Sequence, residues 1–131
     1  MDLKKYFEET EGFGVLATAD ADGRVDAAVY SRPHVIDQST VAFIMADTLS
    51  HRNLTTNPRA VYLFRESRPG HVGMRLYLTR LQEEQDSPLI KELRRRKHSR
   101  EDETARTRFL VYFRIDTVRP LTGSDPAHRE T

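Results

Sequence analysis

The feature that most constrains this chain is a succession of short apolar or alternating segments separated by turn signals. Seven such segments read as predicted strands, at residues 14–19, 24–31, 32–36, 40–45, 60–64, 72–81 and 109–115. Because these segments do not alternate regularly with long helices, their spacing favours an antiparallel sheet or barrel over a parallel sheet. We therefore expect a mainly β fold of six to seven antiparallel strands with a few short helices.

Local signals place the turns and the helix starts. Asp22-Gly23 suits a tight hairpin, because glycine tolerates a positive φ. Residues 2–10 carry Leu3, Tyr6 and Phe7 at helical spacing, which predicts a short helix at this end of the chain. Ser87-Pro88 is typical of a helix start, with serine as the N-cap and proline in the first turn.

Composition excludes several classes of function. The 131 residues suit one domain over 1–131, with a flexible tail at 124–131. The absence of cysteine rules out disulfides, thiolate metal sites and cysteine nucleophiles, and the five histidines show no metal-ligand spacing. The 21 basic and 20 acidic residues give no overall attraction to nucleic acid. Neither a signal peptide nor a membrane span is visible, so we expect a cytoplasmic protein without a membrane partner.

The polar segment 47–58 lies between two apolar strands. Thr48 and Ser50 are candidate N-caps, and Asn57-Pro58 must end any helix that they begin. A helix N-terminus carries free N–H groups and partial positive charge, which suit a phosphate when hydroxyl, imidazole, guanidinium and amide groups are added. A capped surface helix without a ligand explains the same residues, so both readings stay open at this point.

The order of several motifs resembles the FMN-binding split barrels related to pyridoxamine 5′-phosphate oxidase. The resemblance covers roughly residues 5 to 123. It rests on three blocks of sequence. The first is the predicted hairpin and the residues 29–33 that follow it, and the second is the strand and turn 43–48 followed by Asn53-Leu54 and Asn57-Pro58. The third is the last predicted strand, 108–115, followed by residues 120–123. It implies a split β-barrel of Greek-key type that binds FMN.

The resemblance also implies a set of cofactor-binding residues. One strand would run beside the flavin ring and its phosphoribityl arm, and a second group would face the dimethylbenzene or ribityl region. The turn and helix would hold the phosphate, with Arg52 in the role that many relatives give to a lysine. In chain order these residues are Val29, Tyr30, Ser31, Arg32, Met45, Ala46, Asp47, Ser50, His51, Arg52 and Asn53. No catalytic residue is assigned.

The implied function is that of a homodimeric oxidoreductase with FMN at the subunit interface and an unidentified small-molecule substrate or electron donor. The aromatic strand 109–113 offers a candidate interface face. A true pyridoxamine phosphate oxidase is disfavoured, because the C-terminal arginine and histidine segment that binds its substrate has no clear counterpart here. A non-enzymatic flavin binder or electron carrier is the alternative. A third reading, a nucleic-acid-binding barrel that uses the basic run Arg94–Arg100, is weakened by the acidic residues 101–103 that follow.

Overall fold

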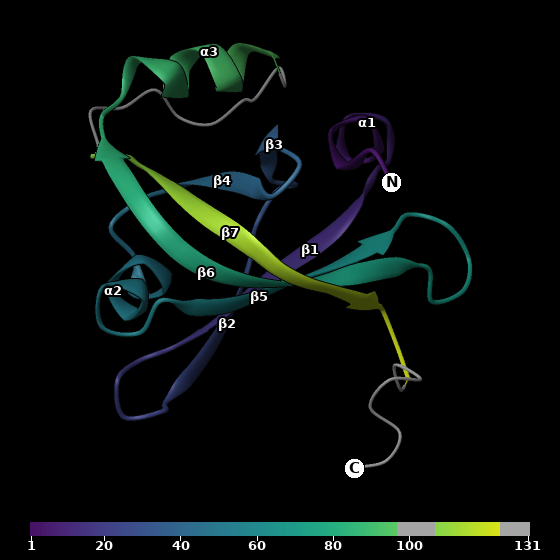
Figure 1. Cartoon of the computed structure of the whole chain (residues 1–131), viewed down its shortest axis with the longest axis horizontal. Coiled ribbons are helices and arrows are strands. Elements are labelled where there is room, and N and C mark those ends of the chain that lie inside the picture. Colours follow the sequence, from purple (N-terminus) through teal and green to yellow (C-terminus); the bar gives the residue numbers. More distant parts are fainter. Residues whose placement is uncertain (97–106, 124–131) are drawn as a thin grey trace.

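A computed structural model describes residues 1–96 and 107–123 of the chain (Figure 1). The helices are α1 (Leu3–Glu9), α2 (Leu49–Thr56) and α3 (Pro88–Arg96). The strands are β1 (Gly12–Ala19), β2 (Val25–Val29), β3 (His34–Asp37), β4 (Thr40–Met45), β5 (Arg59–Glu66), β6 (Gly73–Gln85) and β7 (Phe109–Pro120). The basic run Arg94–Arg100 falls largely outside the described residues, and the predicted tail 124–131 falls outside them entirely.

The seven strands form one antiparallel sheet in the order β2-β1-β5-β6-β7-β4-β3, which confirms the expected mainly β fold. The sheet does not close, as in a split barrel. Although β2 and β3 are consecutive in the chain, they lie at opposite edges of the sheet. Figure 1 shows α1 and α3 on one side of the long β6–β7 pair, and α2 and the turn between β1 and β2 on the other.

The local signals act where the sequence places them. The Asp2 carboxylate caps α1 by accepting a hydrogen bond from the Lys5 N–H at 3.1 Å. The Ser87 hydroxyl oxygen accepts from the Leu89 N–H at 3.2 Å, which confirms the predicted start of α3. Gly23 adopts a φ of 83° in the hairpin between β1 and β2. Each of these features depends on residues within four positions of one another in the sequence, so sequence inspection can find it.

Strands β6 and β7 extend beyond their predicted ends at residues 81 and 115. They pair along nearly their whole length, from Met74 opposite Pro120 to Gln85 opposite Phe109, with two register shifts. The added segments are largely polar and exposed, so no apolar alternation marks them in the sequence. Cross-strand hydrogen bonds rather than side-chain burial hold these extensions.

The main core lies on one face of the sheet. Leu16, Tyr62, Phe64, Leu76 and Phe113 are fully buried there, together with Phe7 of α1. A second, smaller cluster lies under α3, formed by Ala42, Ile90, Leu93 and Leu110.

The position of β7 corrects one expectation about the surface. Leu110, Val111 and Phe113 have no exposed surface, because both sides of this strand segment pack against the two apolar clusters. These three residues are therefore not available to an interface, whereas Phe109 and Tyr112 of the same strand are half-buried. The exposed apolar side chains are found elsewhere on the sheet.

Candidate cofactor site

Helix α2 begins at Leu49, which is 50% exposed, whereas Ser50 and His51 that follow are buried. Thr48 occupies the N-cap position in extended conformation, although its side chain makes no capping hydrogen bond. The N–H of Arg52 is bonded within the helix, to the Thr48 carbonyl oxygen at 3.0 Å. The N–H groups of Leu49, Ser50 and His51 precede this bond and lack an intrahelical acceptor. These N–H groups and the helix dipole favour an anion at this end of α2.

Three of the predicted phosphate ligands turn into the protein. Ser50, His51 and Asn53 are 2%, 6% and 5% exposed. The Asn53 amide donates to the Thr18 hydroxyl oxygen at 3.1 Å, and the Ser50 hydroxyl contacts the Asp26 carboxylate at 3.5 Å. Because these side chains attach α2 to β1 and β2, they are already engaged inside the molecule.

His51 has the most elaborate surroundings of the three. Its ring stacks on Phe109 with centroids 3.9 Å apart, and its Nε2 lies 2.9 Å from Glu83 Oε1. Arg80 pairs with the same carboxylate oxygen at 3.1 Å. The other ring nitrogen, Nδ1, lacks a hydrogen-bond partner, and the Asp47 carboxylate is 3.6 Å away from it. The imidazole thus joins the start of α2 to β6 and β7.

Arg52 and Asp47 lie on the solvent side of the same turn. Their side chains are 61% and 63% exposed, and the guanidinium Nη1 is 3.8 Å from the Asp47 carboxylate. The same nitrogen donates to the Asp47 carbonyl oxygen at a long 3.4 Å. Since exposed pairs of this kind are weak, Arg52 can exchange this partner for a ligand anion. Asp47 adds negative charge beside the helix N-terminus and opposes that exchange.

The strand end 29–32 presents a mixed set of side chains. Val29 is 66% exposed, and Ser31 is exposed beside it. Tyr30 packs edge-on against Phe43, and its carbonyl oxygen accepts a hydrogen bond from the Tyr62 hydroxyl at 3.1 Å. These contacts fix the backbone of Tyr30 and leave Val29 and Ser31 on the surface.

Arg32 is held away from α2. Its Nη1 donates to the carbonyl oxygens of Phe7 and Thr10 at 3.0 and 2.7 Å. These acceptors lie at the C-terminal end of α1, where carbonyl groups lack intrahelical donors and attract a cation. In the structure Arg32 anchors α1. Its contact with the cofactor, which the resemblance implies, stays a prediction.

The residues at the exit of β4 differ in exposure. The Met45 side chain is 1% exposed and belongs to the main core, so it does not line a surface site. Ala46 is half-buried, and its carbonyl oxygen accepts a hydrogen bond from the Thr48 N–H at 2.9 Å. The structure therefore brings Asp47, Arg52 and the start of α2 together on the surface, while Met45, Ser50, His51 and Asn53 face inward.

Several residues that meet α2 were not anticipated from the sequence. Asp26 shares the inward face of β2 with Ala28 and Tyr30, and alternation along the strand was the signal that could have placed it there. Glu83 lies in the extension of β6 that the sequence does not mark. Its approach to His51 spans 32 positions in the chain, and no local pattern indicates it.

The other face of β1, β2 and β5 carries exposed apolar residues. Val25 and Val29 of β2 are 82% and 66% exposed, and Phe13 of β1 and Leu63 of β5 are 56% and 36% exposed. Cross-strand pairing places Val15 beside both Val29 and Leu63, so these side chains form a continuous strip across three strands. We call this surface the β2–β1–β5 face.

A groove of about 470 Å³ continues this face toward β6 and β7. Ala17, Val25 and Val61 contribute apolar surface to it, and Arg59 and Tyr77 stand along it. The guanidinium of Arg119 lies 5.1 Å from the centre of the Tyr77 ring. A hydrogen bond from the Thr79 hydroxyl, with help from Arg114, holds the pKa of the neighbouring Asp116 below its usual range.

The groups at the start of α2 fit a phosphate in part. Three backbone N–H groups and the exposed guanidinium of Arg52 are donors that phosphate oxygens accept. The Nε2 of the buried His51 imidazole and the amide of Asn53 already have protein partners, whereas the Nδ1 of His51 has no hydrogen-bond partner. A phosphate at this position would therefore be held mainly by the main chain. Among the residues that the structure describes, no group of three or more histidine or acidic side chains is arranged to hold a metal ion.

Comparison with known proteins gives matches at the level of structure. Neither a protein-family model nor a curated protein sequence matches the chain. An FMN-binding protein from Syntrophomonas wolfei superposes with a TM-score of 0.75 at 17% identity, covering 93% of this chain and 85% of that one. An F420 reductase superposes with a TM-score of 0.72 at 16% identity, covering 90% and 97% of the two chains.

A pyridoxamine 5′-phosphate oxidase-like protein from Lactobacillus delbrueckii also matches, with a TM-score of 0.67 at 18% identity and coverage of 90% and 91%. The heme storage protein HutZ from Vibrio cholerae has a related fold, with a TM-score of 0.58. No helix in the described ranges is long and apolar enough to span a bilayer. At these identities the comparison shows the fold, and the chain therefore has the split-barrel fold of the pyridoxamine 5′-phosphate oxidase-like proteins.

Proposed function

We propose that this protein is a homodimeric FMN-binding flavoprotein that acts as an oxidoreductase on a substrate other than pyridoxamine phosphate. The observation that carries the proposal is the fold, which the chain shares over nearly its whole described length with an FMN-binding protein and with an F420 reductase. The N-terminus of α2 supports it, because a helix N-terminus suits the phosphate of a nucleotide-like cofactor.

The chain's own residues would divide the work of binding. The N–H groups of Leu49 and Ser50 and the guanidinium of Arg52 bind the phosphate. Val29 and Ser31 lie at the exposed end of β2 and border the flavin ring. His51 fixes α2 to β6 and β7 through its contacts with Glu83 and Phe109. FMN, when bound, supplies the electron and hydride transfer, while the protein provides orientation and electrostatics.

The β2–β1–β5 face supports dimerisation. Val25 and Val29 are among the most exposed apolar side chains of the molecule, and Val15 of β1 lies opposite Val29 on one side and Leu63 on the other. Contiguous exposed apolar surface of this kind marks an interaction site. A twofold axis through this face would bury the strip on both subunits and place the exposed end of β2 at the subunit interface.

The cofactor test uses two arginines with equal exposure. Purified protein is titrated with FMN, and flavin fluorescence reports binding. We expect Arg52→Ala to weaken FMN binding about tenfold, the equivalent of one lost charge-assisted contact. Arg68→Ala is the matched control, because Arg68 is 60% exposed and lies at the opposite end of β5, where it pairs with Glu66. Failure of the parent protein to take up FMN refutes the proposal.

The dimer test uses charge insertion. Val29→Lys should convert a species of about twice the 15.2 kDa chain mass into a monomer in sedimentation equilibrium, because a buried lysine at a symmetric interface lacks a partner. Ile36→Lys is the control, since Ile36 is 41% exposed but lies on the opposite edge strand. A parent protein that sediments as a monomer argues against this assignment.

The alternative of a non-enzymatic flavin binder or electron carrier makes the same binding predictions. Turnover separates the two. Bound FMN that is reduced by dithionite and reoxidised in air, but that oxidises neither NADH nor NADPH at a catalytic rate, favours the carrier.

A further inference from the structure

A second cavity lies on a different part of the molecule from α2 and β2. It has a volume of about 730 Å³ and opens between α1, β3 and α3. Figure 1 shows these two helices on either side of β3. The volume falls within the range of about 300–1,000 Å³ that is usual for small-molecule sites. None of the residues that line this cavity belongs to α2 or β2, although Arg32 directly follows Ser31, which the proposed cofactor site includes.

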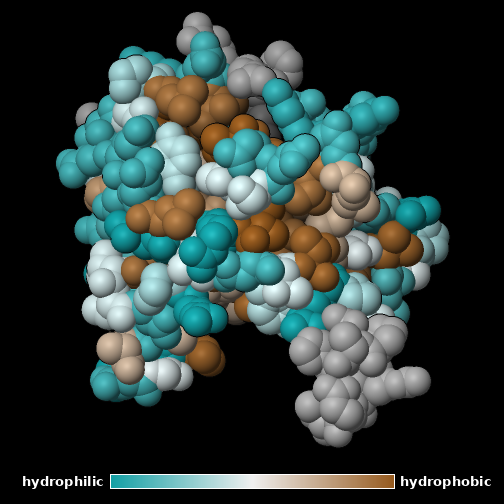
Figure 2. Space-filling model, in the orientation of Figure 1, coloured by the Kyte–Doolittle hydropathy of each residue, from teal (hydrophilic) through white to brown (hydrophobic). Residues whose placement is uncertain are grey.

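The inner part of the cavity is apolar. Phe7 of α1 and Leu93 of α3 form its buried walls, at 2% and 7% exposure, and Val35 of β3 lies half-buried between them. Leu89 and Ile36 extend the apolar lining toward solvent. Figure 2 shows hydrophobic surface at α3 and between α3 and the centre of the molecule. An apolar chain can therefore lie along these walls without losing hydrogen bonds to water.

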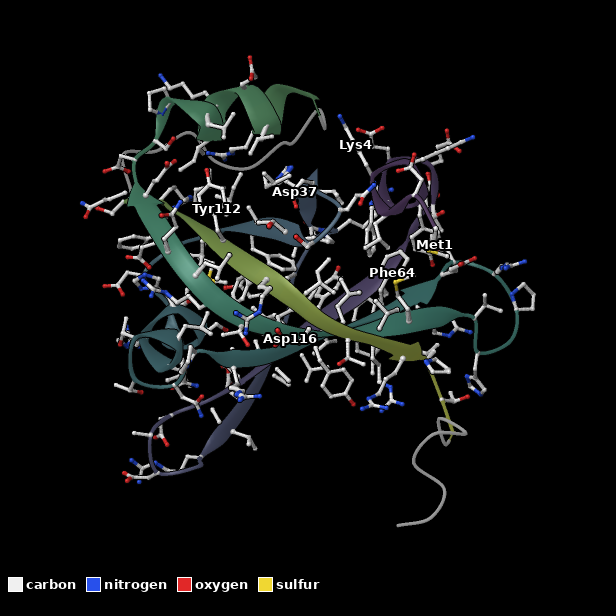
Figure 3. All side chains as sticks on the ribbon, in the orientation of Figure 1. Met1, Lys4, Asp37, Phe64, Tyr112 and Asp116 are labelled. Carbon is white, nitrogen blue, oxygen red and sulfur yellow. The ribbon has the colours of Figure 1, made fainter. Side chains whose placement is uncertain are left out.

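The polar side chains that line the cavity are mostly basic. Among the described residues they are Lys4, Arg32 and His34, together with one acidic residue, Glu8, and of these Lys4 and Glu8 are exposed. Figure 3 shows the Lys4 side chain on the side of α1 that faces α3. The guanidinium of Arg32 is fixed in position by its hydrogen bonds to the end of α1. This arrangement favours one negative charge near Lys4 over a neutral or cationic group.

We propose that this cavity binds a small amphipathic carboxylate, such as a medium-chain fatty acid. The carboxylate pairs with Lys4 at the opening, and the alkyl chain packs against Phe7, Leu89 and Leu93. An apolar interior combined with a few polar groups at one end is the usual design of a small-molecule site. The charge at the opening selects the acid over the corresponding alcohol.

The test measures binding of sodium decanoate to the full chain by isothermal titration calorimetry, with and without FMN. We expect saturable binding of one decanoate per chain in both conditions, which keeps the result independent of the flavin proposal. Lys4→Glu should weaken binding about tenfold, because the substitution replaces attraction by repulsion. Lys5→Glu is the matched control: Lys5 neighbours Lys4 on α1 but does not line the cavity, and its variant should bind as the parent does.

Two further measurements locate the ligand. Leu89→Gln should weaken decanoate binding severalfold, whereas Lys91→Gln, on the exposed side of α3, should not. Decanoate should shift the backbone amide resonances of Phe7 and Val35 in an HSQC spectrum. No saturable binding by the parent, equal affinity in the Lys4→Glu and Lys5→Glu variants, or binding of 1-decanol as tight as that of decanoate overturns the proposal.

Discussion

Replacement of His51 separates a structural role from a ligand role. The imidazole is 6% exposed, is within hydrogen-bonding distance of the Glu83 carboxylate and stacks on Phe109. A hydrogen bond to a charged group contributes about 1.5–3 kcal/mol, and an aromatic stack contributes about 0.5–1.5 kcal/mol. In the His51→Ala variant Glu83 still pairs with Arg80 and has some access to water, so we take the lower part of the summed free energy of these two contacts. We expect His51→Ala to lower the free energy of unfolding by about 2–3 kcal/mol.

Urea unfolding followed by circular dichroism measures this loss as a lower midpoint with an unchanged slope. Arg52→Ala is the counterpart, since its 61% exposed side chain makes only long contacts with Asp47. We expect it to change the unfolding free energy by less than about 0.5 kcal/mol while weakening FMN binding. His51→Phe retains a stacked ring and should recover about 1 kcal/mol of the loss.

The result that would refute this reasoning is the reverse pattern. If His51→Ala unfolds at the urea midpoint of the parent but loses FMN affinity as Arg52→Ala does, then the imidazole contacts the ligand. The inward placement of His51 would then fail to describe the working protein.

Four other substitutions test separate parts of the structure. Gly73→Ala should lower the free energy of unfolding in urea by about 3 kcal/mol or more, because the φ of Gly73 is 156° and the new Cβ would lie 1.9 Å from a carbonyl oxygen of β5. Gly23→Ala should lower it by about 1 kcal/mol, because Gly23 has a φ of 83° but lies in open space. Arg32→Ala should cost about 1–2 kcal/mol and speed amide exchange in α1, whose last carbonyl groups it binds; unchanged exchange would contradict that anchor. Burial raises the pKa of Tyr62, and burial with the Glu66 hydrogen bond raises that of Tyr6, so the folded state favours the protonated phenols. Stability should then be full below the unfolded-state pKa of about 10 and fall as the pH rises above it, with a shallower fall in Tyr62→Phe.

The sequence by itself determined the local elements. Asp22-Gly23 produced the first hairpin, Ser87-Pro88 began α3, and Asn57-Pro58 ended α2. These features could be predicted from the sequence because each depends on residues within a few positions of one another, where backbone sterics and helix capping act. The order of apolar segments also indicated an antiparallel sheet, since the residue pattern carries the strand period directly.

Only the tertiary structure decided which side chains of a recognised element reach solvent. Alternation along β2 places Val25 and Val29 on one face of the strand and Asp26 on the other. The apolar face is the one exposed to solvent, because the face that carries Asp26 packs against α2 and Phe43. In α2 the polar pattern indicated a phosphate clamp, whereas the fold turns His51 toward β6.

The physical reason is the distance along the chain between partners. His51 meets Glu83 at a separation of 32 positions, and Asn53 meets Thr18 at a separation of 35. A buried polar group needs a hydrogen-bond partner, and the identity of that partner depends on the path of the whole sheet. Local sequence therefore specified α2 as a short polar helix, and the sheet around it decided which of its side chains remain available to a ligand.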